Sequence, residues 1–329
     1  MSDELVKAPS GAVVVSLAED GLEPPALIER AGGAARFAWD EFFFAEHHNP
    51  HTRKAYMRAA RRFLEWAGER GAELATITPG LVGRHLAEMG GSPSKRNLHL
   101  SALRGFFNVL VNRHVMILNP AASVRGVKEQ IIEGKTPEIS VEQARAMLAS
   151  VDVSRVVGLR DRAILGTLAY TACRSGAVAG LRLGDFQHDG TRTSLRFREK
   201  GGKSREIPAR RELENFIRAY LDAAGLVDQP KDSPLFRTAA GGAPQRLTDN
   251  PLTSKRICEM VKRRLKDAGL PSRLSPHSFR VAAITDLLRQ GVPLEDVQYL
   301  AGHAEPRTTR LYDRRRRTVA RDVVERIFN

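Results

Sequence analysis

The most telling run of residues in this chain reads Ser275-Pro276-His277-Ser278-Phe279-Arg280. Serine followed by proline is typical of a helix start, with Ser275 as the N-cap and Pro276 in the first turn. His277 and Arg280 then lie three residues apart on one face, close to the helix N-terminus. Because unpaired N–H groups and the positive end of the helix dipole meet there, this position suits a phosphate.

Two further short runs follow, Ala301-Gly302-His303 and Thr308-Thr309-Arg310-Leu311-Tyr312. The first ends a predicted helix and places His303 in a turn; the second belongs to another short helix. A phosphodiester can be cut where a hydroxyl nucleophile, cations and proton-transfer groups converge. Tyr312 would be the nucleophile, Arg280 a cation, and His277 or His303 the proton-transfer group. We therefore expect these elements to form one cleft.

Taken singly, each of these residues has a simpler explanation. An isolated histidine is more often structural than catalytic, and an isolated tyrosine usually belongs to a core or its rim. The HExxH pattern and related zinc spacings are absent, which disfavours a metal site built on these histidines. We expect neither a metal nor a cofactor.

The charge of the chain favours a polyanionic partner. Its 329 residues include 52 Lys and Arg against 38 Asp and Glu, a formal net charge of +14. Such a surplus indicates nucleic acid, and a soluble protein that is merely basic is the alternative. The hydrophobic fraction of 42% is enough for real cores, and the length suits two domains or one large one.

The cysteines and the N-terminus exclude other classes. Cys173 and Cys258 are far apart, so neither a disulfide framework nor a CxxC metal site is indicated. Residues 1–10 lack a basic segment before an apolar run, and the valines at 13–15 are too few to cross a membrane. We expect a cytoplasmic protein without a membrane partner.

Composition and periodicity divide the chain into five segments. We expect an N-terminal arm with the composition of a poorly ordered segment, a helical DNA-binding domain, a linker, a catalytic domain and a C-terminal tail, at residues 1–35, 36–125, 126–138, 139–317 and 318–329. A helix with Thr52 as its N-cap has one apolar face. Its other face carries Arg53, Lys54, Arg58, Arg61 and Arg62. A charged face is usually only solvated, but in so basic a chain we expect it to contact the DNA backbone.

One segment of the catalytic domain changes to a period of two. Residues 193–197 alternate polar and apolar side chains, residues 199–203 form a turn signal, and a second strand follows to Pro208. This pattern predicts a β-hairpin with Lys200 and Lys203 at its tip. We expect Lys203 and Arg205 to contact DNA.

The ordered set of motifs resembles the tyrosine recombinase family, also called phage integrases. The matching motifs are Thr171-Ala172-Cys173-Arg174-Ser175, the lysine-bearing hairpin, His277-Ser278-Phe279-Arg280, Leu300-Ala301-Gly302-His303 and Thr308-Thr309-Arg310-Leu311-Tyr312. They cover residues 140–315, and the helical block at 36–125 is similar to the family's core-binding domain. The resemblance implies a mainly α protein: a helical, SAM-like core-binding domain and a mostly α catalytic domain with a small antiparallel sheet.

The resemblance also implies a role for each site residue. Arg174 and Arg280 would clamp the scissile phosphate, Lys200 would protonate the leaving 5′-oxygen with Lys203 as its possible substitute, His277 would act as general acid/base, His303 would donate a hydrogen bond to the phosphate, and Tyr312 would attack phosphorus. Two positions depart from the family pattern. Ala177 stands where an acidic residue usually orients the first arginine, and Val281 stands where histidine is common.

The implied function is site-specific recombination through a 3′-phosphotyrosine intermediate, without metal or ATP. A tetramer would bind double-stranded DNA at paired half-sites and exchange strands through a four-way junction, with accessory proteins as further partners. The apolar stripe in the C-terminal tail would dock on a neighbouring protomer. The alternatives are relaxation of supercoils, as by a type IB topoisomerase, and a non-catalytic DNA-binding relative. Because Tyr312, Arg174 and Arg280 are all present, the second alternative is disfavoured.

Overall fold

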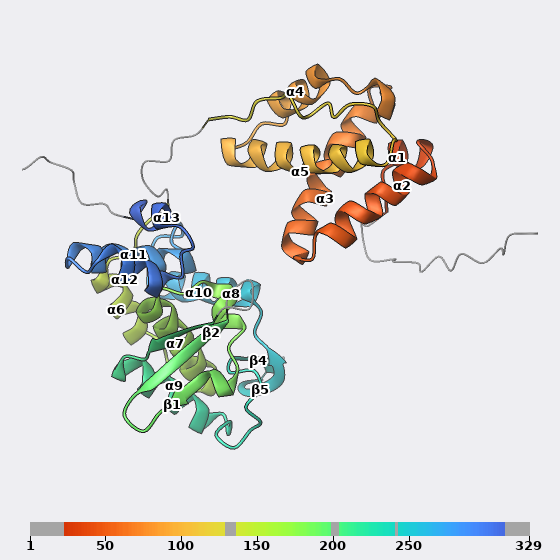
Figure 1. The fold of residues 1–329 in the computed structure, drawn as a ribbon. Helices are drawn as coiled ribbons and strands as arrows, with labels where there is room; N and C mark the ends of the chain where they lie inside the picture. Colours follow the sequence, from red (N-terminus) through yellow and green to blue (C-terminus); the bar gives the residue numbers. More distant parts are fainter. Residues whose placement is uncertain (1–22, 129–135, 199–203, 241–242, 313–329) are drawn as a thin grey trace, which may run out of the picture. The chain divides into compact units, whose positions relative to one another are not determined.

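A computed structural model describes residues 23–128, 136–198, 204–240 and 243–312 of the chain. By its internal contacts the chain divides into two compact units, Met1–Gln130 and Ile131–Asn329, each with its own hydrophobic core (Figure 1). The division falls inside the segment predicted as a linker.

The described part of the first unit is helical throughout. Its elements are α1 (Ala26–Arg30), α2 (Gly33–Asp40), the π-helical turn η1 (Glu41–Glu46), α3 (Pro50–Gly68), the 3₁₀ turn η2 (Leu74–Thr76), α4 (Pro79–Glu88) and α5 (Pro93–Asn112). The longer helices begin at an N-cap followed by proline. Thr78 and Ser92 cap α4 and α5. Asn49, rather than Thr52, caps α3, and its side chain accepts the N–H of His51.

Aromatic side chains form the centre of the first unit. The ring of Trp39 lies 4.4 Å from that of Phe43 and 5.5 Å from that of Phe106, and Phe42 packs against both phenylalanines. Gly105 allows this packing, because a Cβ at that position would lie 2.8 Å from the Phe42 ring. A larger residue at position 105 would therefore force the Phe42 ring or the helix to shift.

The end of the predicted N-terminal arm needs correction. Residues 26–35, which we assigned to the arm, form α1 and the start of α2, and they bury Leu27, Ile28 and Ala35 in the core of the first unit. Gly32 and Gly33 suggested a poorly ordered arm or a short appended element, but Gly32 (φ +89°) serves as the turn between two packed helices. The helical unit therefore begins about ten residues before the predicted position.

The second unit is mostly helical with two small sheets. Its elements are α6 (Val141–Ala149), α7 (Val156–Thr171), α8 (Ser175–Ala179), η3 (Leu183–Asp185), β1 (Phe186–His188), β2 (Thr193–Arg198), β3 (Ser204–Pro208), α9 (Arg211–Ala223), β4 (Arg237–Ala240), β5 (Ala243–Pro251), α10 (Ser254–Asp267), α11 (Pro276–Arg289), α12 (Leu294–Ala301) and α13 (Pro306–Arg310). The predicted fold class is confirmed.

Helix α7 is the centre of the second unit. After Arg162 its side chains are mainly apolar, with Ile164, Leu165 and Leu168 fully buried, and it packs against α9 and α11. An element of this kind belongs in a core. Its C-terminal end leads directly into the Arg174 motif, so packing of α7 fixes where that motif lies.

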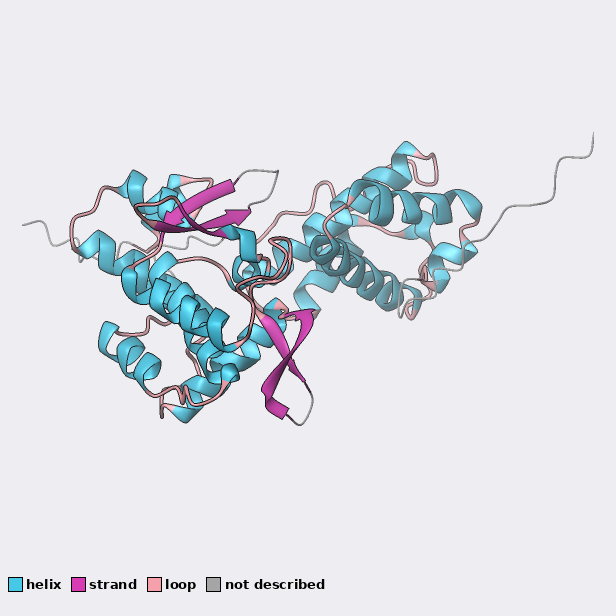
Figure 2. Ribbon diagram, turned by 90° about the horizontal axis from the view of Figure 1, so that it is seen from below, coloured by secondary structure: helices cyan, strands magenta, loops and turns pink. Residues whose placement is uncertain are grey.

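Both sheets are antiparallel. Strands β1, β2 and β3 form the first, and the register pairs Phe197 with Arg205 and Arg198 with Ser204. The predicted strands around the lysine-bearing turn are thus confirmed. Strands β4 and β5 form a second sheet that the sequence did not indicate, and Figure 2 shows the two sheets as separate patches among helices. Among the described residues no helix is both long and apolar enough to cross a membrane.

Candidate active site

Helix α11 carries two of the predicted site residues in its first two turns. Pro276 occupies the first helical position, and the N–H of Ser275 donates to Ser278 Oγ over 3.1 Å. The His277 side chain is exposed, while Arg280, one turn further, is only 1% exposed. The helix therefore presents a histidine at the surface and an arginine beneath it.

The guanidinium of Arg280 is buried and only partly paired. Its Nη1 donates to the backbone oxygen of Ala172, but Nε and Nη2 have no hydrogen-bond partner among the described residues. Burial, with a contribution from the charge of Arg174, lowers the pKa of Arg280 to about 10, so it stays a cation at neutral pH. A buried guanidinium with unpaired N–H groups destabilises the folded protein unless an anion accepts hydrogen bonds from those groups.

The other side of the site is formed by aromatic rings. Tyr312 Oη lies 3.2 Å from His277 Nε2, and the Tyr312 ring stacks on the His303 ring with centroids 5.5 Å apart. Nδ1 of His303 is 2.8 Å from the hydroxyl of Thr309. The backbone oxygen of Tyr312 accepts from the Thr285 hydroxyl over 3.3 Å. These contacts hold the tyrosine between the two histidines.

Both histidines are uncharged at neutral pH in the free protein. Burial first, and then the charges of Arg280 and Arg174, lower the pKa of His303 to about 3. Partial desolvation and the same two arginines lower the pKa of His277. Both rings are therefore neutral at pH 7. A neutral His277 can accept a phenolic proton at Nε2, and a neutral His303 that accepts from Thr309 carries its proton on Nε2.

Arg174 is close enough to act on these pKa values, yet it is not held in place. It is exposed and directly precedes α8, and its backbone oxygen accepts the N–H groups of Ala177 and Val178, but its side chain forms no hydrogen bond or ion pair with another described residue. Ala177, at the position of the missing carboxylate, packs on the core instead. The backbone after Arg174 is fixed by the 2.9 Å hydrogen bond between Ser175 Oγ and Ser254 Oγ. The structure thus brings Arg174 near His277, Arg280, His303 and Tyr312 without a substitute for the carboxylate.

The remaining predicted residues have different outcomes. Lys200 and Lys203 lie outside the described residues. The assignment of Arg205 to DNA binding needs correction, since its side chain is only 6% exposed and its Nη1 donates to backbone oxygens of Tyr299 and Leu300. Arg205 is basic, but burial removes it from the surface where DNA would lie.

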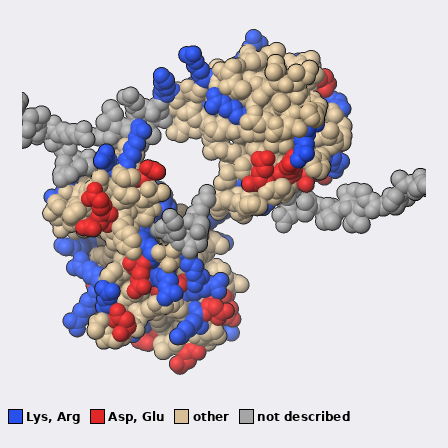
Figure 3. All heavy atoms as spheres, in the orientation of Figure 1, with Lys and Arg blue, Asp and Glu red and all other residues tan. Residues whose placement is uncertain are grey.

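Of the five basic residues that we predicted to contact DNA from α3, three have exposed side chains that are available for such a contact. Lys54, Arg58 and Arg62 are spaced four residues apart and exposed, and their side chains form no hydrogen bond or ion pair with other described residues. Arg53 instead lies over the Phe44 ring at 5.3 Å, and Arg61 donates to the backbone oxygen of Glu23. Figure 3 shows that Lys and Arg side chains occur on both units, mixed on the second unit with Asp and Glu.

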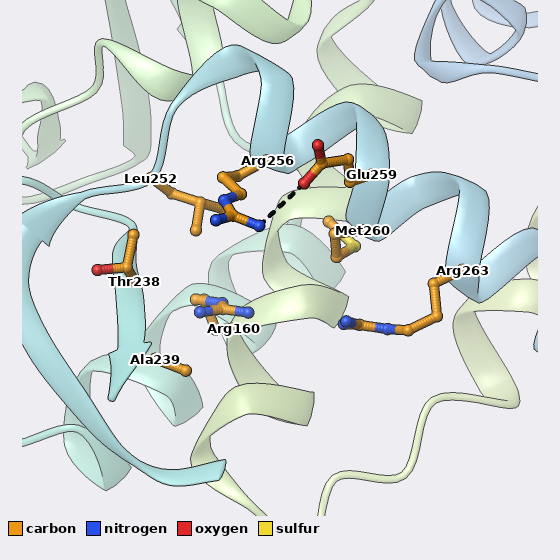
Figure 4. Close-up of a pocket in the computed structure, with 8 residues that line it drawn as sticks. All are labelled: Arg160, Thr238, Ala239, Leu252, Arg256, Glu259, Met260 and Arg263. Atoms are coloured by element: carbon orange, nitrogen blue, oxygen red, sulfur yellow. Dashed lines mark hydrogen bonds and ion pairs between the residues drawn. The ribbon is translucent and has the colours of Figure 1, made fainter. Parts of the chain in front are cut away.

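A separate pocket of about 580 Å³ lies between α7, α10 and the β4–β5 sheet (Figure 4). Three arginines line it, but Arg160 and Arg263 bind the carboxylate of Asp161, and Arg256 binds Glu259 over 3.2 Å. Each of these arginines thus already has a carboxylate partner within the protein. The described residues contain no group of three or more His, Cys, Asp or Glu side chains placed to hold a metal ion.

Comparison with known proteins identifies this arrangement. The model described as "Phage integrase family" matches residues 138–318, more than half of the chain, and "Phage integrase, N-terminal SAM-like domain" matches residues 38–114. The chain belongs to the phage integrase family. Among curated members, "Tyrosine recombinase XerC" of Pelobacter propionicus is 30% identical over 270 residues, which is 80% of this chain and 84% of that protein. "Tyrosine recombinase XerD" of Chlorobaculum tepidum is 27% identical over 83% of this chain and 88% of that protein. This member of the family is accordingly a tyrosine-type site-specific recombinase.

Solved structures of family members share the fold. The XerH recombinase bound to palindromic difH substrate, a post-cleavage complex, has a TM-score of 0.65 at 21% identity and covers 79% of this chain and 75% of that one. A lambda integrase dimer bound to a COC′ core site has a TM-score of 0.62 at 18% identity, covering 85% and 96%. At these identities the likeness supports the fold.

Sequence reasoning missed the residues that support the site. Thr309 and Thr285 hold His303 and the backbone of Tyr312, and Ala172 (φ +51°) supplies the oxygen that receives Arg280. Thr309 and Ala172 belong to two of the recognised motifs but had no predicted role, and Thr285 belongs to none of them. No periodic signal marks Ala172 or Thr285, because each acts through a contact with a segment far away in the sequence.

Proposed function

We propose that Tyr312 of this recombinase cleaves one DNA strand by attacking the scissile phosphorus, forming a 3′-phosphotyrosine and releasing a 5′-hydroxyl. The observation that carries this proposal is the 3.2 Å distance between Tyr312 Oη and His277 Nε2, beside a buried arginine whose Nε and Nη2 have no hydrogen-bond partner among the described residues. The phenol proton passes to His277 as the O–P bond forms. Rejoining reverses these steps with a 5′-hydroxyl from the partner strand.

The cations stabilise the transition state. Nε and Nη2 of Arg280 would bind non-bridging oxygens of the phosphate, and Arg174 would bind from the exposed side. His303 would donate Nε2–H to a third oxygen. Lys200, or Lys203 in its place, would protonate the leaving 5′-oxygen from the hairpin. A covalent phosphotyrosine conserves the energy of the phosphodiester, so religation needs no ATP.

Assembly follows from the family. One solved relative, lambda integrase, forms a tetramer bound to a Holliday junction, and its fold matches this chain with a TM-score of 0.61. We infer that four copies of this protein hold two double-stranded DNA sites and exchange strands through the same kind of junction. Each copy would contact the DNA backbone through the basic stripe of α3 formed by Lys54, Arg58 and Arg62.

Covalent trapping tests the mechanism. DNA half-sites are first selected from random duplex DNA by their binding to the protein. A duplex that contains these half-sites and a nick near the cleavage point is then used as the substrate, so that the cleaved strand stays attached to the protein. In EDTA, the wild-type protein should form a covalent adduct with the 3′ end, and Tyr312→Phe should form none while binding DNA equally well. An adduct that persists in Tyr312→Phe would refute the assignment. Relaxation of supercoiled plasmids that lack the site would instead favour a topoisomerase.

A further inference from the structure

Arg205 is a buried arginine placed between two elements of the catalytic unit. It is the second residue of β3, opposite Phe197 of β2, and its guanidinium lies 5.7 Å from the Phe197 ring centroid. Nη1 donates to Tyr299 O over 3.0 Å and also to Leu300 O. These oxygens belong to the last turn of α12, where backbone carbonyls lack helical partners. Arg205 therefore ties the hairpin to the end of that helix.

The end of α12 is also where His303 begins its turn. Gly302 takes the left-handed conformation (φ +62°), and its N–H donates to Tyr299 O, the same oxygen that Arg205 binds. The N–H of His303 donates to Gln298 O over 3.1 Å, and Gln298 Nε2 donates back to His303 O over 3.0 Å. A shift of the last turn of α12 would thus move the His303 ring directly.

Arg205 also acts on His303 electrostatically. The charge of Arg205 is one of the causes that lower the pKa of His303, and it has the same effect on Arg280. An ordinary structural arginine would stabilise the fold without affecting one particular catalytic ring. Here the hydrogen bonds and the burial of Arg205, together with the effect of its charge on His303, all connect Arg205 with the turn that holds His303.

We propose that Arg205 is a positioning residue for strand cleavage, which holds the last turn of α12 so that the His303 ring stays against Tyr312 and the phosphate. This inference rests on the proposed function for its kinetic consequences. It assigns Arg205 an action through His303 rather than contact with DNA.

A double-mutant cycle tests whether Arg205 acts through His303. Single-turnover cleavage of the nicked duplex is measured for wild type, Arg205→Met, His303→Ala and the double variant. Misplacing a reacting group by about 1 Å costs up to about 100-fold in rate, so Arg205→Met should lose roughly 10- to 100-fold. The double variant should be no slower than His303→Ala alone. Effects that multiply would overturn the proposal.

Two variants control for general damage. Arg196→Met removes an arginine from the same hairpin, one that bonds Gln187 over 2.6 Å instead of α12, and its effect should be small and independent of His303→Ala. Arg205→Lys keeps the charge and one donor to the carbonyls, so it should recover part of the lost rate. A rate for Arg205→Lys no better than that of Arg205→Met would contradict positioning by these hydrogen bonds.

The third measurement needs neither DNA nor catalysis. NMR titration of the His303 ring in the free protein should give a pKa near 3 in the wild type and a higher pKa in Arg205→Met, because a neighbouring charge is lost and the turn loosens. An unchanged His303 titration in a folded Arg205→Met variant would also overturn the proposal. If the wild type forms no covalent adduct, the proposed function fails. The NMR titration still shows in that case whether Arg205 influences the His303 ring.

Discussion

Asp161 is a buried carboxylate of the second unit that is surrounded by arginines. Its carboxylate is fully buried and accepts hydrogen bonds from Arg160 on α7 and from Arg263 and Arg264 on α10. The sequence showed Arg160 and Asp161 only as adjacent charges at the start of an apolar helix. It gave no sign that α10, a hundred residues later, supplies two more cations.

Replacing Asp161 should destabilise the second unit strongly. Asp161→Asn leaves three arginines around a neutral amide, two of them poorly exposed, and should cost about 3–5 kcal/mol of unfolding free energy. Glu259→Gln, which removes an exposed carboxylate from α10, should cost less than about 1 kcal/mol. Urea unfolding followed by circular dichroism measures both. Equal effects of the two variants would show that the Asp161 cluster contributes little.

Helices α4 and α5 of the first unit enclose two histidines that resemble core residues more than site residues. His85 is 2% exposed, its ring lies 5.0 Å from that of Trp66 and 6.4 Å from that of His99, and neither of its nitrogens has a hydrogen-bond partner in the described chain. Burial, His99, Arg62 and Arg70 lower its pKa to about 4. Protonating His85 therefore opposes folding.

The first unit should consequently lose stability in mild acid. The unfolded chain binds the His85 proton below pH 6.5 and the folded chain does so only below about 4. Stability is therefore complete above pH 6.5 and declines as the pH falls through this window, by about 3 kcal/mol for this residue. Both tryptophans of the chain, Trp39 and Trp66, lie in the first unit, so tryptophan fluorescence follows its unfolding. In His85→Leu the decline should be smaller; the same decline in both proteins would exclude His85 as its cause.

Elements with a regular pattern were predictable from the sequence, and irregular ones were not. Strands β2 and β3 follow from alternation around a lysine-bearing turn. The second sheet was missed because Thr, Ala, Gly and Pro around residues 237–251 do not alternate. Helix α1 was missed because five residues beside paired prolines and glycines look like a linker. Its packing against α2 and α3 makes it part of the fold.

Across the whole molecule, the residues that cluster at the site were predictable and the contacts that support them were not. Motif order singled out His277, Arg280, His303 and Tyr312, and the structure brings these four side chains together. The net charge of +14 indicated DNA but did not distinguish exposed cations from buried ones. Arg205 was therefore misassigned, while Lys54, Arg58 and Arg62 are exposed as expected.

DNA binding of the full chain should depend on salt in proportion to these contacts. Each phosphate contact contributes about 0.9 to the slope of log affinity against log salt, so Lys54→Gln, Arg58→Gln and Arg62→Gln together should reduce the slope by about 2–3. Arg36→Gln, whose native side chain pairs with Glu29, is the matched control and should change it little. Binding assays over a range of NaCl concentrations measure the slope. An unchanged slope in the triple variant would place the DNA on another face.

The half-paired guanidinium of Arg280 has a consequence for the protein without DNA. A ligand that binds only the folded state raises its stability with the logarithm of ligand concentration. An oxyanion such as sulfate that accepts hydrogen bonds from Nε and Nη2 should therefore raise the melting temperature of the wild type. The melting temperature of Arg280→Met should rise only by the general amount that sulfate causes through its exclusion from protein surfaces. Melting curves in sulfate and chloride at equal ionic strength separate the two contributions. The stability of the folded protein would then depend on an anion bound at Arg280, the same side chain that is proposed to bind the scissile phosphate. Without DNA, this buried cation has no anion beside it among the described residues.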